Sequence, residues 1–132
     1  MKITADTNVI IRAAIQDDRE QSLQAAHALH EATLVALPLP ALCEFVWVLR
    51  QGYKLPVADI SDALQRLTNC ANVVINRPAV EAGLALLNAG GDFADGVIAY
   101  EGNWSGAEEF VSFDKKAVAR LQAQGVPARL LS

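Results

Sequence analysis

The chain begins with Met1-Lys2-Ile3-Thr4-Ala5-Asp6-Thr7-Asn8-Val9-Ile10-Ile11, in which a short strand-like run is followed by an aspartate and then by an apolar run. Aspartate is a favoured helix N-cap, so Asp6 can begin a helix near Thr7. The polar side chains of Thr7 and Asn8 could also support a metal ligand at Asp6, because ligands are oriented by neighbouring groups. The stretch predicts a strand, a turn that presents an acid, and a helix.

The same alternation continues along the chain. Five short β-type runs are separated by helical segments, and they cover residues 2–5, 33–37, 72–75, 109–113 and 128–131. Residues 57–70 repeat apolar side chains at helical spacing, which predicts an amphipathic helix. A second helix over residues 115–124 is closed by Gly125, with Pro127 beyond it. Strands that alternate with helices indicate an α/β fold, with a parallel sheet covered on both faces.

The composition limits the possible classes of protein. The 132 residues fit one domain, and 52% apolar with 20% charged residues is typical of a globular chain. The formal charge of −4 argues against a broad basic surface for nucleic acid, although a cluster of catalytic carboxylates would itself supply negative charge. No apolar run approaches the length of a membrane span, and the start lacks a signal-peptide pattern. We expect a cytoplasmic protein that does not contact a membrane.

Acidic residues occur where a charge is costly. Glu44 lies inside the apolar run 41–49, Asp92 and Asp95 open the apolar segment 91–99, and Asp6 and Asp114 directly follow strand-like runs. A buried carboxylate is unfavourable unless it is paired or bound to a metal, and these segments offer no matching Lys or Arg. Mg²⁺ and Mn²⁺ prefer oxygen ligands. The pattern therefore predicts a divalent cation, Mg²⁺ or Mn²⁺.

The same acids have structural alternatives. Asp6 and Asp114 fall at carboxyl ends of predicted strands, where ligands of open parallel sheets bind, but either could simply cap a helix. Asp92 also looks like an N-cap, with Asp95 at the third helical position. A salt bridge to Arg50 or Lys54 would be the structural explanation for Glu44. Gly96 weakens its helix by ~1 kcal/mol relative to Ala, which suggests close approach of another backbone.

Four pieces in this order and spacing resemble the PIN-domain family, and within it the VapC-type ribonuclease toxins. They are Asp6-Thr7-Asn8-Val9-Ile10, the helical Glu44, Asp92-Phe93-Ala94-Asp95-Gly96-Val97-Ile98-Ala99, and Ser112-Phe113-Asp114. The resemblance implies a single PIN-like domain over residues 1–132, folded as a three-layer α/β/α sandwich around a central parallel sheet of about five strands. Two departures are Gly96 in place of the usual Ala and Ser112 where Thr is common.

The resemblance also implies the site and the reaction. The matching metal-site and catalytic positions are Asp6, Glu44, Asp95 and Asp114, with Asp92 as a further candidate and Asn8 and Ser112 in supporting positions. A cation held there would activate a water for attack on an RNA phosphodiester. We expect a Mg²⁺- or Mn²⁺-dependent endoribonuclease, the toxin of a toxin–antitoxin pair, that forms a homodimer and is inhibited by a protein antitoxin.

Two other functions remain open. One is a non-catalytic RNA- or protein-binding module that kept the scaffold; unused buried acids would destabilise such a module. The other is a Mg²⁺-dependent phosphatase of another doubly wound fold, which usually carries a second Asp two residues after its nucleophilic Asp. Asn8 occupies that position here.

Aromatic and basic residues give weaker signals for RNA binding. Trp47 and Trp104 could stack on bases, but Trp47 is predicted to belong to the core. Five cations could meet RNA phosphates, although a solvated surface position is the default for each: Arg12, Arg50, Lys54, Lys115 and Lys116.

Overall fold

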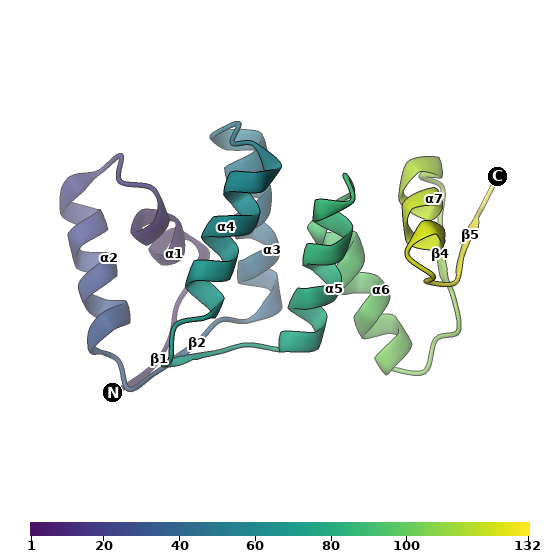
Figure 1. Cartoon of the computed structure of the whole chain (residues 1–132). Helices are drawn as coiled ribbons and strands as arrows, with labels where there is room; N and C mark the ends of the chain where they lie inside the picture. The colour runs from purple at the N-terminus through teal and green to yellow at the C-terminus, as the bar shows by residue number, and fades with distance from the viewer. The chain divides into compact units, whose positions relative to one another are not determined.

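The computed structural model describes residues 1–132 as two compact units, Met1–Asn76 and Arg77–Ser132. In Figure 1 the first unit runs from purple to teal and the second from green to yellow. Seven α-helices, one π-helical turn and five short strands alternate along the chain.

The first unit contains a three-stranded parallel sheet. Its strands are β1 (Lys2–Thr4), β2 (Leu34–Ala36) and β3 (Val73–Val74), in the order β1-β2-β3. Its helical segments are α1 (Thr7–Ala14), α2 (Arg19–Glu31), α3 (Leu39–Trp47), η1 (Val48–Gly52, the π-helical turn) and α4 (Val57–Thr68). Since β1 and β2 are parallel, with Ile3 opposite Val35, α1 and α3 start from the same edge of the sheet.

The core of the first unit comes from one face of each helix. The helix α4 has the amphipathic pattern predicted over residues 57–70: Ile60 and Leu64 are fully buried, while Asp62 and Arg66 form an exposed i,i+4 ion pair. Burying one such aliphatic side chain contributes about 1.5–3 kcal/mol. The other fully buried side chains of this unit include Ile10, Val35, Leu37, Leu42, Phe45 and Leu49.

The second unit combines three helices with a small parallel sheet. It contains α5 (Arg77–Asn88), α6 (Phe93–Trp104), β4 (Phe110–Ser112), α7 (Lys115–Ala123) and β5 (Ala128–Leu130), and β4 pairs with β5. The helix α7 ends as predicted, with Gly125 at φ +79°. Such a left-handed conformation favours glycine, which has no Cβ.

The glycine in α6 allows two helices to approach closely. A Cβ added at Gly96 would lie 2.6 Å from the carbonyl oxygen of Ala82 in α5. On the facing helix, a Cβ at Gly83 would lie 2.6 Å from the ring of Phe93. The close backbone approach predicted at Gly96 is therefore confirmed, and it explains why this helix interior lacks a side chain there.

The predicted fold class is confirmed. The chain has an α/β fold with parallel strands, and all five predicted strands form, each with fewer residues than expected. The prediction of one central sheet of about five strands is wrong for this structure. The strands form two sheets, one of three strands in the first unit and one of two strands in the second, and no hydrogen-bonded pair joins the two sheets. Every helix is too short or too polar to cross a membrane.

Candidate functional site

Two strand–helix turns, one in each unit, hold an aspartate in the same way. Asp6 follows β1 and caps α1, with its Oδ1 accepting a hydrogen bond from the Val9 N–H at 3.1 Å. Asp114 follows β4 and caps α7, with its Oδ1 accepting from Lys116 N–H at 3.0 Å and Ala117 N–H at 3.1 Å. The capping role is confirmed for both. Because capping uses only Oδ1, the Oδ2 atom of each carboxylate makes no hydrogen bond and can accept another partner.

Two further acids lie at the start of α6. Asp92 is the N-cap, with Oδ1 accepting from the Ala94 N–H at 3.1 Å, and Asp95 follows at the third helical position, as predicted. Asp95 is half-buried and makes no hydrogen bond through its carboxylate. Burial raises the pKa of Asp95 above its ordinary value, and the negative charges of Asp92 and Asp114 raise it further. The second unit thus brings Asp92, Asp95 and Asp114 into electrostatic contact.

The donor chemistry of this group fits a hard cation. Three carboxylates interact at the N-terminal ends of α6 and α7, where helix dipoles favour negative charge. Burial, together with the negative charges of Asp92 and Asp114, nevertheless raises the pKa of Asp95. Within each unit, no group of three or more His, Cys, Asp or Glu side chains stands ready to hold a metal ion. The residues fit a divalent ion by their oxygen chemistry.

Glu44 occupies a different environment from the one predicted. It lies in α3, in contact with α1 in the first unit, and its side chain is exposed. The buried face of α3 is formed by Leu42, Phe45 and Val46, so the helix turns Glu44 outward. Trp47, one turn later, is also exposed, at 62%. The prediction that Trp47 belongs to the core is wrong, because an apolar run does not reveal which face of a helix is covered.

The expectation that the candidate acids are buried is corrected in the same way. Asp6, Asp92 and Asp114 are exposed, and only Asp95 is half-buried. An N-cap lies at the solvent-facing end of its helix, so a capping carboxylate needs no compensating cation to remain charged. Asp6, at the start of α1, and Glu44, inside α3, belong to the first unit, whereas Asp92, Asp95 and Asp114 belong to the second.

The supporting residues divide into one that contacts an aspartate and one that does not. Ser112 Oγ accepts a hydrogen bond from the Asp114 N–H at 3.0 Å, and the Ser112 carbonyl accepts one from the Leu131 N–H at 2.8 Å. The hydroxyl common to Ser and Thr is therefore used to fix the backbone of Asp114. Asn8 is exposed in the first turn of α1 and makes no side-chain hydrogen bond.

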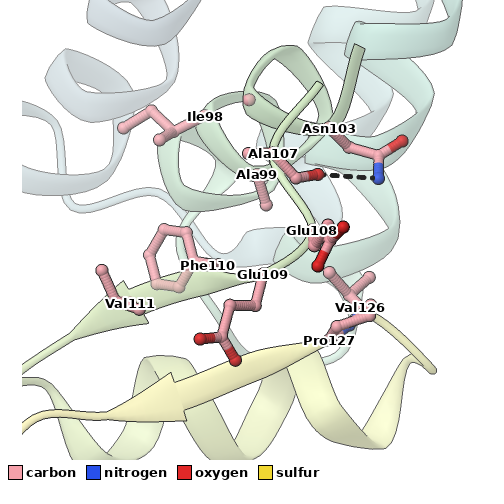
Figure 2. Close-up of a pocket in the computed structure, with 11 residues that line it drawn as sticks. Ile98, Ala99, Asn103, Ala107, Glu108, Glu109, Phe110, Val111, Val126 and Pro127 are labelled. Atoms are coloured by element: carbon pink, nitrogen blue, oxygen red, sulfur yellow. Dashed lines mark hydrogen bonds between the residues drawn. The ribbon is translucent and has the colours of Figure 1, made fainter. Parts of the chain in front are cut away.

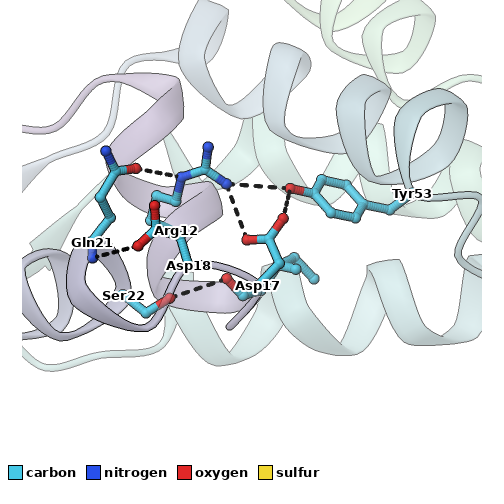
Figure 3. Close-up of polar contacts among 7 residues, drawn as sticks. Arg12, Asp17, Asp18, Gln21, Ser22 and Tyr53 are labelled. Carbon is cyan, nitrogen blue, oxygen red and sulfur yellow. Dashed lines mark hydrogen bonds and ion pairs between the residues drawn. The ribbon is translucent and has the colours of Figure 1, made fainter.

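The basic residues differ in how far they are already engaged. Figure 3 shows the Arg12 guanidinium donating to Asp17 at 3.0 Å and to Gln21 at 2.8 Å, while the Tyr53 hydroxyl donates to Asp17 at 2.8 Å. The Tyr53 hydroxyl lowers the pKa of Asp17, and the Arg12 charge lowers it further against an opposing effect of desolvation. The same hydrogen bond raises the pKa of Tyr53. Arg12 is thus held within the first unit rather than presented to a ligand.

By contrast, the two lysines after Asp114 are unpaired. Lys115 and Lys116 are exposed, and neither takes part in an ion pair. Phe113, on the other side of Asp114, is 78% exposed. We did not predict a role for Phe113 from the sequence; the available signal was an aromatic residue placed directly beside a strand-end aspartate.

A small cavity of the second unit lies away from these acids. Its volume is about 250 Å³, and Figure 2 shows residues that line it, among them Ile98, Asn103, Phe110 and Pro127. Two acids line it, Glu108 and Glu109, and Glu109 is already paired, with the Arg129 Nε donating to it at 2.7 Å. None of the five candidate carboxylates lines this cavity, so we do not assign the chemistry to it.

Comparison with protein families gives one match. The family model described as PIN domain matches residues 3–122, which is most of the chain and includes parts of both units. The matched range contains all five candidate carboxylates. None of the curated proteins compared with the chain matches it.

Proposed function

Because the chain belongs to the PIN domain family, we propose that it is a metal-dependent endoribonuclease that hydrolyses RNA phosphodiester bonds. Proteins of this family are typically metal-dependent nucleases, usually use divalent ions and bind RNA. The family thus supports a nuclease of the hydrolase class, and the choice of RNA is the finer step of the proposal. We further propose one PIN domain over residues 1–132, since the family model includes parts of both units.

The observation that carries this proposal is the state of Asp95. It is a half-buried carboxylate without a hydrogen-bond partner, and its pKa is raised by burial, by Asp92 and by Asp114. Exposed acids carry no burial cost, so the mere presence of Asp6 or Glu44 does not distinguish an enzyme from a binding module. Asp95 does carry such a cost, and functional sites are where perturbed carboxylates concentrate. This favours a catalytic site over a non-catalytic scaffold.

We propose that Asp6, Glu44, Asp95 and Asp114 together hold the ion, with Asp92 mainly capping α6. Asp6 and Asp114 would each contribute the Oδ2 atom that capping leaves unused, and Asp95 would contribute its unpaired carboxylate. The exposed Glu44 carboxylate would orient the attacking water by a hydrogen bond. A bound Mg²⁺ or Mn²⁺ would supply Lewis-acid chemistry, making water a better nucleophile and stabilising charge on the phosphodiester.

The biological assignment is a VapC-type toxin, inhibited by a protein antitoxin and acting as a homodimer. It rests on the four motif pieces and their spacing along the chain. Coexpression with the product of a neighbouring small reading frame tests this: the toxin assignment predicts growth arrest by the chain alone and rescue by the partner. Growth that is unaffected by the chain would argue against the toxin role while leaving the nuclease activity to be measured separately.

The nuclease is tested with purified protein and single-stranded RNA in Mg²⁺ or Mn²⁺. Wild-type protein should cut RNA, and Asp95→Asn should lower the rate by orders of magnitude because it removes a charged ligand. The matched control is Asp59→Asn, an exposed acid in the first turn of α4 that should keep full activity. Thermal melts add a second readout, since a bound ion stabilises by about 2.7 kcal/mol at 100 times its Kd. Wild-type cleavage by Asp95→Asn, together with equal melting temperatures in EDTA and excess Mg²⁺, would reject this site.

A further inference from the structure

Two of the proposed catalytic acids each have an exposed aromatic neighbour. Phe113 directly precedes Asp114 and is 78% exposed, although apolar residues of this size are usually covered. Trp47 lies one helical turn after Glu44 in α3 and is 62% exposed. Residues three apart lie on the same face of a helix, so Trp47 and Glu44 point to the same side of α3. Each aromatic is thus close to one acid of its own unit.

The backbone at Phe113 is held on both sides. Before it, Ser112 is the last residue of β4, and its carbonyl accepts a hydrogen bond from the Leu131 N–H at 2.8 Å. After it, the Asp114 N–H donates to Ser112 Oγ at 3.0 Å, and the Asp114 side chain caps α7. The exposed ring therefore projects from a fixed backbone. A ligand that contacts the ring would not have to order a loop first.

Two unpaired cations next to Phe113 can contact an anionic ligand, beside the carboxylate of Asp114. The helix α7 carries Lys115, Lys116 and Arg120 and no acidic residue, in a chain whose net charge is −4. Lys115 and Lys116 are exposed and unpaired, and they follow Phe113 by two and three residues. An aromatic surface next to cations and a helix N-terminus suits a base with its attached phosphate. Another protein would need a larger apolar surface, since the exposed apolar residues of β4 and the turn after it are Phe113 and, at 46%, Val111.

We propose that Phe113 and Trp47 stack on unpaired nucleobases of the RNA, and that Lys115 and Lys116 contact its phosphates. This inference rests on the proposed nuclease function and adds the residues that select the substrate. A nucleotide whose phosphate lies at Asp114 or Glu44 has its base within reach of the neighbouring ring. Bases in a duplex are already stacked on each other, so the enzyme discriminates for single-stranded or looped RNA.

Binding is measured in the Asp95→Asn background, so that cleavage does not interfere. The probes are a fluorescein-labelled single-stranded RNA of mixed sequence and the same RNA annealed to its complement. Phe113→Ala and Trp47→Ala should each weaken binding of the single strand by roughly 5- to 150-fold, while Phe113→Trp should retain it. Duplex binding should be equally weak in all variants. Leu23→Ala is the matched control, because Leu23 is also 62% exposed but lies in α2, a helix that carries none of the candidate carboxylates.

The outcomes separate this inference from the nuclease proposal. If the wild type cuts single-stranded RNA and both alanine variants bind and cut it equally well, stacking is wrong and the nuclease assignment stands. A wild type that cuts duplex RNA as fast as the single strand also overturns the inference. Lower melting temperatures for Phe113→Ala and Trp47→Ala would show that the rings are structural. A changed oligomeric state in analytical ultracentrifugation, with unchanged RNA binding, would show a protein-contact surface instead.

Discussion

The turn after β1 and the turn after β4 use the same local arrangement with different neighbours. Each places an aspartate two residues beyond the strand, caps the next helix through Oδ1 and leaves Oδ2 without a hydrogen bond. The residue before Asp6 is Ala5, which is 2% exposed, whereas the residue before Asp114 is Phe113, which is 78% exposed. The cation in α1, Arg12, is held by Asp17, whereas Lys115 and Lys116 in α7 are unpaired.

This comparison distinguishes the hydrogen bonds that orient each aspartate from the residues that surround it. Capping orients both carboxylates, and it requires only a short polar residue at the start of a helix. The exposed ring and the unpaired lysines are not needed for capping, because the turn at Asp6 caps its helix without them. We therefore infer that capping, which both turns share, orients the carboxylates. The exposed ring and the two lysines, which only the second turn has, serve to contact a ligand there.

The largest expected effect is on catalysis. Asp6→Asn and Asp114→Asn should each lower RNA cleavage by orders of magnitude while the protein stays folded, because Asn caps a helix as well as Asp but lacks the charge. Asp18→Asn is the matched control: Asp18 caps α2 through a 3.1 Å bond from the Gln21 N–H and belongs to no candidate site. Initial rates in Mg²⁺ are measured for all three. If Asp18→Asn lost as much activity as Asp6→Asn, the shared arrangement would be structural only.

The next effect concerns the helix that carries Asp95. Gly96→Ala should lower the free energy of unfolding by about 1–3 kcal/mol, because the new Cβ would lie 2.6 Å from the Ala82 carbonyl. Gly102→Ala in the same helix is the control: its Cβ would have only the Ala107 Cβ nearby, at 4.0 Å. That variant should be neutral or gain up to ~1 kcal/mol from helix propensity. Urea unfolding of both variants is the measurement, and equal stabilities would contradict the close packing of α5 and α6.

A smaller effect compares the two caps directly. Asp6→Ala and Asp114→Ala should each destabilise by about 0.5–2 kcal/mol, whereas the Asn variants should stay near wild type. Asp114→Ala should cost more than Asp6→Ala, because Asp114 accepts two backbone hydrogen bonds and Asp6 accepts one. Unfolding in EDTA removes any contribution from bound ions. If Asp6→Ala were less stable than Asp114→Ala, the number of backbone hydrogen bonds that each aspartate accepts would not determine the cost of losing the cap.

The smallest expected effect concerns the hydrogen-bond network of the first unit in which Asp17 holds Arg12. Tyr53→Phe removes the hydrogen bond that lowers the pKa of Asp17 and raises that of Tyr53. A lowered carboxyl pKa contributes stability above its ordinary value of 3.8, and this is lost as the pH falls through the folded-state value. A raised tyrosine pKa contributes stability that is lost as the pH rises above 10.0. Wild type should therefore exceed Tyr53→Phe in melting temperature only between these limits, and a constant difference down to pH 2 would refute this linkage.

Local patterns predicted much of the fold. All five strands were expected from short β-type runs, and the cap at Asp92 with Asp95 three residues later was expected from their order. These features depend on neighbours within a few residues, which the sequence displays directly. The close approach at Gly96 was also inferred, because a glycine inside a helix needs a reason such as a facing backbone.

Other features could not be obtained this way. Glu44 and Trp47 were expected inside, but α3 buries Leu42, Phe45 and Val46 instead, since packing of a helix chooses the covered face. The hydrogen bond from Tyr53 to Asp17 joins residues 36 positions apart, and no local pattern announces it.

Capping, helical spacing and glycine placement act over one or two turns, so the amino-acid order of this protein was enough to locate its strands, its helices and its acids. Exposure and ionisation depend on which surfaces meet after folding. The raised pKa of Asp95 arises from burial and from Asp114, which is 19 residues further along the chain. The exposed ring of Phe113 likewise depends on β4 pairing with β5 and on the turn that Ser112 closes. Desolvation and charge interactions act through space, and only the folded chain brings these groups within range of one another.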